Sequence, residues 1–143
     1  MIKFLTTDQT LDLRSSGLRE GLNRSLCGFE GDDEEDSFHV GYFRDGMAVG
    51  IATFHKQLKE GFSGTGFQLR GMVTHHDFQK EGIGNQLLNF SIVYLKGKQI
   101  DYIWCNARKT AYKFYERIGF EYISDEFELP KIGPHKVMFL KIN

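Results

Sequence analysis

Two glycines follow a glutamine at close spacing in the segment Gln79-Lys80-Glu81-Gly82-Ile83-Gly84. A strand-like pattern precedes this segment and an amphipathic helical pattern follows it. Glycines at the start of a helix let the backbone approach a ligand closely, and the first helical amides and the helix dipole favour a bound phosphate. The segment lacks the Gly-Lys-Ser/Thr ending of a nucleoside-triphosphate loop and the early glycine of a dinucleotide site. It therefore indicates a phosphate-binding loop for a ligand other than ATP or NAD, with an ordinary strand-to-helix turn as the alternative.

The surrounding residues define the elements that must position this loop. Apolar residues recur at helical spacing over residues 84–96 and again over 107–118, where Gly119 ends the second helix. Strand patterns cover residues 2–5, 38–43, 47–54, 67–74, 100–105, 120–127 and 137–142. Phe67, Leu69, Gly71 and Val73 are expected on one face of their strand. Hairpins early in the chain and alternating strands and helices later predict an α+β, or mixed α/β, fold.

Composition favours a single packed domain over residues 1–143. The chain is 41% hydrophobic and 26% charged, with a formal net charge of −1. That charge gives no long-range attraction to nucleic acid or to an acidic membrane. The sequence has neither an apolar run of about 18 residues nor a signal-peptide pattern, so we expect a cytoplasmic protein. Cys27 and Cys105 lack metal-ligand spacing and are expected to stay reduced.

Taken together, the loop and the second helix resemble the GNAT superfamily of N-acetyltransferases. The residues that carry the resemblance are Gln79, Gly82, Gly84, Ala111, Phe114, Tyr115, Gly119 and Phe120. The similarity is strong over residues 67–120 and looser elsewhere. It implies a GNAT-like splayed, largely antiparallel sheet flanked by helices. That sheet opens between its fourth and fifth strands to hold acetyl-coenzyme A as a co-substrate, and no metal is expected.

The resemblance also implies roles for individual residues. The end of the fourth strand would offer backbone groups to the pantetheine and the thioester, through Met72, Val73 and Thr74. The loop would surround the pyrophosphate, through Gln79, Lys80, Glu81, Gly82, Ile83, Gly84 and Asn85. Tyr115 would lie beside the sulfur as a general acid that protonates the leaving thiolate, while a strand-end N–H stabilises the oxyanion. Packing in the core is the alternative for Tyr115, although Tyr112 and Phe114 suit that role better.

The sequence departs from the family pattern in two ways. Arg108 stands where many members have Asn, seven residues before the catalytic Tyr, and Asn106 lies two residues earlier. We take both as candidate cofactor contacts. The acidic general base found in many members has no clear counterpart, because the polar face of the fourth strand carries Gln68 and Arg70. The remaining candidate bases are His75, His76 and Asp101.

Other polar residues are assigned structural roles. The acidic run at residues 32–36 is expected to be a solvated loop, because its spacing matches no Ca²⁺ site. His39, His55 and His135 show no paired ligand spacing, so no metal site is expected. Residues 132–135 are interpreted as a turn that could border the acceptor pocket. Cys105 is expected to be a core thiol, which favours direct attack in a ternary complex over an acyl-enzyme.

We therefore expect an enzyme that moves an acetyl group from acetyl-coenzyme A to the amine of a small-molecule or peptide acceptor. Neither nucleic acid nor membrane is an expected partner, and homodimerisation is left open. The alternative function is a non-catalytic module that binds or senses acyl-coenzyme A. Arg70 has two interpretations as well: it could clamp an anionic acceptor, or it could form a structural ion pair.

Overall fold

The computed structural model describes all 143 residues. Its strands are β1 (Ile2–Leu5), β2 (Phe38–Arg44), β3 (Met47–Lys56), β4 (Gly66–Thr74), β5 (Tyr102–Arg108), β6 (Glu121–Tyr122), β7 (Phe127–Leu129) and β8 (Gly133–Lys141). The α-helices are α1 (Leu11–Leu18), α2 (Ile83–Gly97) and α3 (Tyr112–Ile118), and four short 3-10 helices are η1 (Asp8–Thr10), η2 (Arg24–Leu26), η3 (His76–Phe78) and η4 (Lys109–Ala111). All strands belong to one sheet of order β1-β2-β3-β4-β5-β8-β6, with β7 paired to β8.

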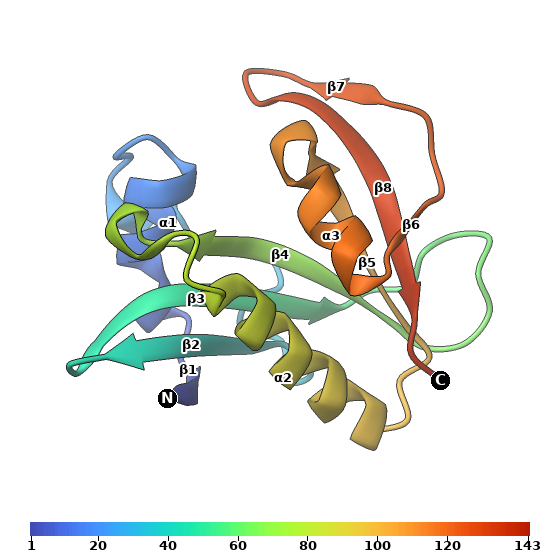
Figure 1. Cartoon of the computed structure of the whole chain (residues 1–143), viewed down its shortest axis with the longest axis horizontal. Coiled ribbons are helices and arrows are strands. Elements are labelled where there is room, and N and C mark those ends of the chain that lie inside the picture. Colours follow the sequence, from blue (N-terminus) through green and yellow to red (C-terminus); the bar gives the residue numbers. More distant parts are fainter.

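The sheet opens between β4 and β5, its only parallel pair of strands. These strands pair from Gly66↔Tyr102 to Gln68↔Trp104 and no further, although β4 continues to Thr74 and β5 to Arg108. Figure 1 shows the two strands starting together near the C-terminus and then pointing apart. The expected α+β fold with a splayed, largely antiparallel sheet is thus confirmed. We call the region between the separated ends the split.

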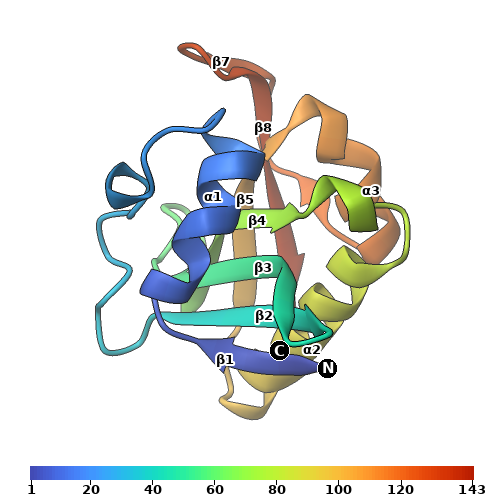
Figure 2. The ribbon, with the colours of Figure 1, turned by 90° about the vertical axis from the view of Figure 1, so that its left-hand side faces the viewer.

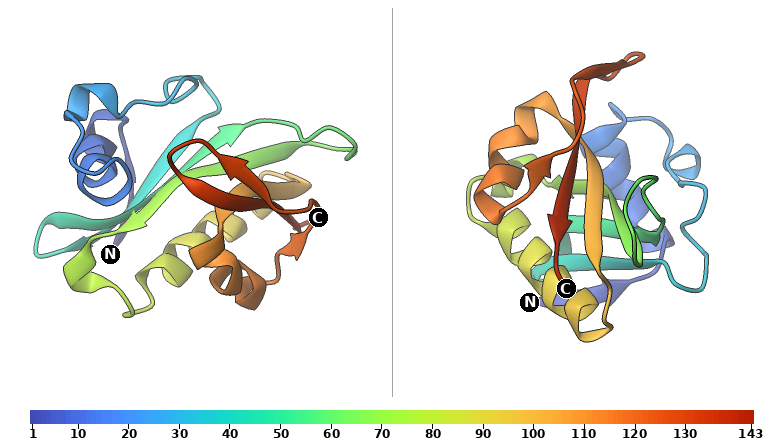
Figure 3. Two further views of the ribbon diagram at one scale, coloured as in Figure 1. Left: turned by 90° about the horizontal axis from the view of Figure 1, so that it is seen from above. Right: turned by 90° about the vertical axis from the view of Figure 1, so that its right-hand side faces the viewer.

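The helices cover opposite faces of this sheet. Helix α1 packs on β3 and β4 from one side, while α2 packs on β2, β3 and β4 from the other and α3 contacts β5. Figures 2 and 3 both show α1 on one side of the strands and α2 with α3 on the other. The face of the sheet on the side of α1 is called the α1 face below. The opposite face is held by a tight helix–sheet contact at Gly50, where a Cβ would lie 2.6 Å from the Ile83 side chain.

A β-bulge changes the direction of the side chains along β4. Ile51 pairs with Val73 and Thr53 with Arg70, so Gly71 and Met72 together stand opposite one residue of β3. Gly71 has φ +60°, a conformation that glycine adopts without strain. The expectation of one continuous face along β4 is therefore wrong. Phe67 and Leu69 lie in the main core, whereas Val73 lies against α1 at Gly17.

Several predicted boundaries also require correction. The Arg44-Asp45-Gly46 hairpin turn is confirmed, with φ of +52° at Asp45 and +79° at Gly46. The second predicted helix starts too early, because Ala107 and Arg108 continue β5 by pairing with β8. The predicted strand over residues 120–127 reduces to β6 and the start of β7. Residues 133–135 belong to β8 rather than to a turn, because β7 pairs with them.

Candidate active site

The separated end of β4 presents backbone groups towards the split. The His75 N–H donates to the Val49 carbonyl at 2.7 Å, so this residue bonds towards β3. Because successive residues of a strand direct their backbone groups to opposite edges, Val73 also faces β3, while Met72 and Thr74 face the split. The Thr74 carbonyl accepts a hydrogen bond from Gln79 Nε2 at 3.3 Å, which ties the strand end to the predicted phosphate loop.

That loop leads into α2 with its amides free of side-chain caps. Gly82 is the N-cap, with φ +80° and no side chain to occupy the first turn. The first α-helical backbone bond of α2 runs from Gln86 N to Gly82 O, at 3.0 Å. The amides of Ile83, Gly84 and Asn85 therefore have no partner within the helix. A Cβ built on Gly82 would have no protein atom within 4 Å, so a ligand can approach the backbone there.

Gly84 joins three elements at one point. A Cβ on Gly84 would lie 3.2 Å from Met72 Cε and 3.4 Å from the Phe114 ring. The absence of a side chain at Gly84 therefore allows β4 and α3 to close on the start of α2. Two charged residues of the loop are exposed: Glu81 pairs with Arg44 at 2.6 Å, and Lys80 makes no ion pair.

Tyr115 and Cys105 face one another beneath α3. Both side chains belong to the main core, with Tyr115 8% and Cys105 3% exposed. Burial raises the pKa of Tyr115 well above its ordinary value, and the adjacent Cys105 thiol shifts it in the same direction. Burial also raises the pKa of Cys105 to about 12, although the Tyr115 hydroxyl works in the opposite direction. The phenol and the thiol are therefore both protonated at neutral pH, which supplies a proton donor and removes Cys105 as a nucleophile.

The α1 face brings polar residues to both sides of the split. Gln68 and Trp104 are the last paired residues of β4 and β5. Continuing along each strand with period two places Arg70, Asn106 and Arg108 on the same face. Asn106 and Arg108 are exposed there, and their predicted contact with the cofactor stays a prediction.

The side chain of Arg70 is half-buried and forms neither an ion pair nor a hydrogen bond. Its guanidinium instead lies 4.5 Å from the centre of the Phe29 ring. Burial lowers the pKa of Arg70, with Asp32 acting against this shift and Arg14 adding to it. An arginine nevertheless stays charged at neutral pH. The structural ion pair considered for this residue is thus not formed, and its donors remain available.

His135 is a candidate base that the sequence did not single out. It is opposite Arg108 in the β5–β8 ladder, and directly paired residues share a face of the sheet. His135 is 3% exposed, and its Nδ1 lies 2.8 Å from the Gly133 carbonyl. Since a carbonyl only accepts hydrogen bonds, Nδ1 carries a proton, which leaves Nε2 as the ring nitrogen that can accept one. The sequence predicts residues 132–135 as a turn near the acceptor pocket, but only the strand register puts His135 opposite Arg108.

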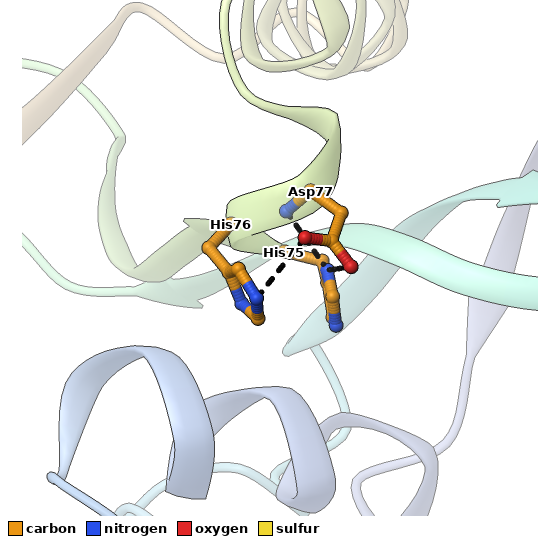
Figure 4. Close-up of side chains that lie close together, drawn as sticks. All are labelled: His75, His76 and Asp77. Atoms are coloured by element: carbon orange, nitrogen blue, oxygen red, sulfur yellow. Dashed lines mark hydrogen bonds and ion pairs between the residues drawn. The ribbon is translucent and has the colours of Figure 1, made fainter.

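The earlier candidate bases are placed differently. Asp101, the residue just before β5, accepts a hydrogen bond from the Thr65 amide at 2.7 Å, next to the paired start of β4 and β5. The side chain of His76 is 81% exposed. Figure 4 shows His75, His76 and Asp77 together at the end of β4, where the two rings stack with centres 4.4 Å apart.

These three side chains are the one group of donors close enough together to hold a metal ion, with their donor atoms within 4.8 Å of one another. His76 Nε2 lies 3.1 Å from an Asp77 carboxylate oxygen. His75 Nδ1 accepts a hydrogen bond from the Asp77 amide at 3.1 Å and so caps η3. The cluster therefore has a structural role in the turn that precedes the phosphate loop.

The acidic run needs a correction at its first residue. Residues 33–36 are exposed as expected, but Asp32 is 5% exposed and binds the fully buried Arg14 through both carboxylate oxygens, at 2.7 and 3.1 Å. Burial alone would raise the pKa of Asp32, yet hydrogen bonds from His55, Arg14 and the Phe29 amide outweigh it and hold that pKa well below its ordinary value. Nothing in the local sequence indicates that a distant arginine would bury one of these five acidic residues.

Comparison with known proteins agrees with this architecture. Residues 23–133 match the acetyltransferase (GNAT) domain family. The chain is 30% identical over 139 residues to the uncharacterized N-acetyltransferase YitI of Bacillus subtilis (strain 168), covering 96% of this chain and 93% of that protein. An aminoglycoside 6'-N-acetyltransferase complexed with coenzyme A has a similar structure, with a TM-score of 0.78 at 17% identity, covering 100% of this chain and 97% of that one. Escherichia coli ElaA is equally similar in fold, with a TM-score of 0.78 at 17% identity, covering 97% of this chain and 98% of that one.

The chain therefore belongs to the GNAT family and is an N-acetyltransferase. Coenzyme A is bound by a relative in this family, and the acceptors named for relatives include aminoglycosides and a ribosomal protein. None of the helices combines the length and apolar character that crossing a membrane requires.

Proposed function

We propose that this chain acts as a single domain that moves an acetyl group from acetyl-coenzyme A to the amine of a small acceptor carrying an anionic group. The observation that carries the proposal is the split between β4 and β5. On one face of the sheet, the split is bordered by the N-terminus of α2, whose free amides suit a phosphate group. On the α1 face, it is bordered by polar side chains without partners. Two substrates could thus enter from opposite faces and meet between the strands.

On the cofactor side, the amides of Ile83, Gly84 and Asn85 are positioned to receive the pyrophosphate, with Lys80 as an added cation. Met72 and Thr74 offer backbone groups to the pantetheine from the β4 edge. In this arrangement Val73 contributes through its position in the strand rather than through its own N–H, which faces β3. Gln79 holds the strand end and the loop together.

On the acceptor side, Arg70 supplies a half-buried guanidinium that no protein carboxylate neutralises. Such a group binds carboxylate or phosphate with two parallel hydrogen bonds. Asn106 and Arg108 border the same face from β5. Arg108 can thus contact either substrate, and it adds a second positive charge near the acceptor.

The chemistry follows from these positions. His135 Nε2 accepts the proton from the acceptor ammonium, and the neutral amine attacks the thioester carbonyl. A backbone N–H at the end of β4 stabilises the tetrahedral oxyanion. As the C–S bond breaks, Tyr115 gives its proton to the departing thiolate, so the products are an amide and free coenzyme A. No acyl-enzyme is formed, because Cys105 stays a buried thiol.

A screen of acceptors tests this function. The protein is incubated with acetyl-coenzyme A and pairs of amines that differ only in charge, namely amino acids and their carboxamides, and free thiol is followed. We expect thiol release with carboxylate-bearing amines and little with their carboxamides. Tight coenzyme A binding without thiol release from any amine would favour the non-catalytic binding module instead.

The role of Arg70 is tested with one variant that removes its charge and one that keeps it. Arg70→Gln should raise the acceptor KM for carboxylate-bearing amines while leaving the coenzyme A affinity unchanged, and Arg70→Lys should restore only part of the loss. Arg117→Gln, a change at an exposed residue of α3, serves as the matched control. Equal effects of Arg70→Gln on charged and neutral acceptors would rule out the clamp.

A further inference from the structure

The ion pair between Arg14 and Asp32 is the one arginine or lysine salt bridge of the protein whose side chains are both buried. The same carboxylate also contacts the buried His55, and every pair that does not include Asp32 has a substantially exposed partner. Removing two charges from water is costly, and a buried pair often stabilises a fold less than apolar residues would. The pair also receives extensive support: Arg14 donates to Thr53 Oγ1 at 2.8 Å and to the Cys27 carbonyl at 3.2 Å, and His55 Nε2 lies 2.9 Å from Asp32. So many specific contacts fix its position closely.

The pair determines where Phe29 lies. Asp32 Oδ2 accepts a hydrogen bond from the Phe29 amide at 2.7 Å, and the Arg14 guanidinium is 3.9 Å from the centre of the Phe29 ring. The ring in turn fills the space beside the β4 bulge, since a Cβ on Gly71 would come within 2.7 Å of it. Asp32 therefore fixes the backbone of Phe29 through a hydrogen bond, and the Arg14 guanidinium packs on the face of its ring.

The Arg70 side chain packs on the same ring. The guanidinium of Arg70 lies 4.5 Å from the ring centre and has no other partner among the charged groups. A flexible four-bond side chain without a hydrogen bond would otherwise sample many rotamers. The Phe29 ring is thus the surface against which this side chain is ordered.

A buried donor next to the bulge strengthens this connection. Arg14 Nε is buried without a hydrogen-bond partner, and it lies 3.4 Å from the position of a Cβ on Gly71. Its four hydrogen bonds all use the two Nη atoms. Leaving a buried N–H unpaired is unfavourable, so Arg14 is held in this place by the pair with Asp32 despite that cost.

We propose that Asp32 is a positioning residue for acceptor recognition: through Arg14 and Phe29 it sets the location of the Arg70 guanidinium beside the split. This inference rests on the proposed function, in which Arg70 contacts the acceptor anion. Asp32 itself touches no substrate. It determines how well one clamp residue is preorganised, and so how strongly charged acceptors are distinguished from neutral ones.

The first experiment needs no acceptor. NMR signals of the Arg70 side chain are assigned by their loss in Arg70→Lys, and the ring current of Phe29 should shift them upfield. Asp32→Asn should return these signals towards random-coil positions, whereas Glu35→Gln, which removes an exposed charge three residues away, should leave them unchanged. Unaltered Arg70 signals in folded Asp32→Asn would overturn the proposal. If that variant does not fold, Phe29→Leu keeps the Arg14–Asp32 pair and must increase the mobility of the Arg70 side chain in 15N relaxation, because the surface that orders it is removed; unchanged mobility would overturn the proposal.

The second experiment is a double-mutant cycle with a carboxylate-bearing amine and its carboxamide. Asp32→Asn should raise the KM for the charged amine about fivefold or more, with kcat and coenzyme A affinity nearly unchanged, and this effect should vanish in the Arg70→Gln background. Additive effects of the two changes would mean that Asp32 does not act through Arg70. If Arg70→Gln alone has no effect on charged acceptors, the acceptor part of the proposed function fails instead. The NMR result then decides separately whether Asp32 positions the side chain.

Discussion

The Tyr115 hydroxyl lies against the Cys105 thiol on the α3 side of β5, and each group alters the pKa of the other. Tyr115→Phe removes the phenolic proton and keeps the ring in the core. If Tyr115 protonates the thiolate, turnover should fall by roughly 10²-fold or more, the usual scale of general acid catalysis. Coenzyme A affinity, measured by calorimetry, should change little.

Tyr112→Phe is the matched control for this change, because Tyr112 is also buried and its hydroxyl binds Glu126 at 3.1 Å outside the split. It should retain turnover. Since the pKa of Tyr115 is raised well above 10, its ionisation should cause no loss of kcat up to pH 10. Wild-type turnover in Tyr115→Phe would assign the proton to another donor.

The phosphate loop can be tested through charge alone. Asn and Asp both tolerate the left-handed conformation that Gly82 adopts at φ +80°, and they have nearly the same shape. Gly82→Asp places a negative charge beside the amides of Ile83 and Gly84, whereas Gly82→Asn does not. Coenzyme A should bind Gly82→Asp more than about tenfold less tightly than Gly82→Asn, from the helix dipole and the phosphate charge together. Equal affinities, measured by calorimetry, would place the pyrophosphate elsewhere.

Direct attack by the amine and an acyl-enzyme intermediate are two possible routes, and they predict opposite effects of replacing Cys105. The pKa of this thiol is about 12 and its side chain is 3% exposed, so it should not form a thiolate at the pH of the reaction. Cys105→Ala should therefore keep turnover within a few-fold of the wild type, with a modest loss of thermal stability from the missing sulfur. Intact-mass measurement of wild type with acetyl-coenzyme A should show no added acetyl group. An acetylated protein that disappears in Cys105→Ala would establish the covalent route.

Acid should destabilise the fold in two separate ranges. His39 Nε2 donates to the Asp32 carbonyl and its Nδ1 lies 2.8 Å from Thr53 Oγ1, which already accepts from Arg14. Burial is the main cause of the lowered pKa of His39. A lowered folded-state pKa means that the unfolded chain binds the proton first, so stability should fall as the pH drops below about 6.5.

Asp32 acts in a lower range. Its folded-state pKa is well below its ordinary value, so its contribution is complete above about pH 4 to 5 and is lost as the pH falls further. Thermal melts of wild type and His39→Gln should therefore differ in slope between pH 7 and 5. The step below pH 4 should persist in His39→Gln. A wild-type melting temperature that is flat from pH 7 to 5 would contradict the role assigned to His39.

The elements that depend on local pattern were predicted well from the sequence. Helix α2 and the hairpin at Asp45 and Gly46 follow from periodicity and turn chemistry, and both were placed within a residue or two. The β4 bulge was not predicted, because its position depends on pairing with β3 rather than on residues 70–72 themselves. The predicted start of α3 was wrong for a related reason: Arg108 extends β5 only because β8 lies beside it.

The candidate site divides in the same way. The cofactor side is a contiguous segment, so its loop could be located from glycine spacing. The acceptor side is assembled from β4, β5, β8 and the segment before β2. His135 and Asp32 gained their positions from strand register and from a partner 18 residues distant, Arg14. Nothing in the local sequence distinguishes either residue from its neighbours.

The two parts of the sheet meet through three register pairs, Gly66↔Tyr102 to Gln68↔Trp104, and beyond them each strand has an edge without a neighbour. A cofactor whose pantetheine bonds to Met72 and Thr74 would stand where a further strand belongs. Coenzyme A would then be a component of the architecture as well as a reactant, because its amides would complete a ladder that the polypeptide leaves unfinished. The free energy of unfolding would then rise with cofactor concentration. In every turnover, the pairing between the β4 edge and the cofactor would be broken and formed again.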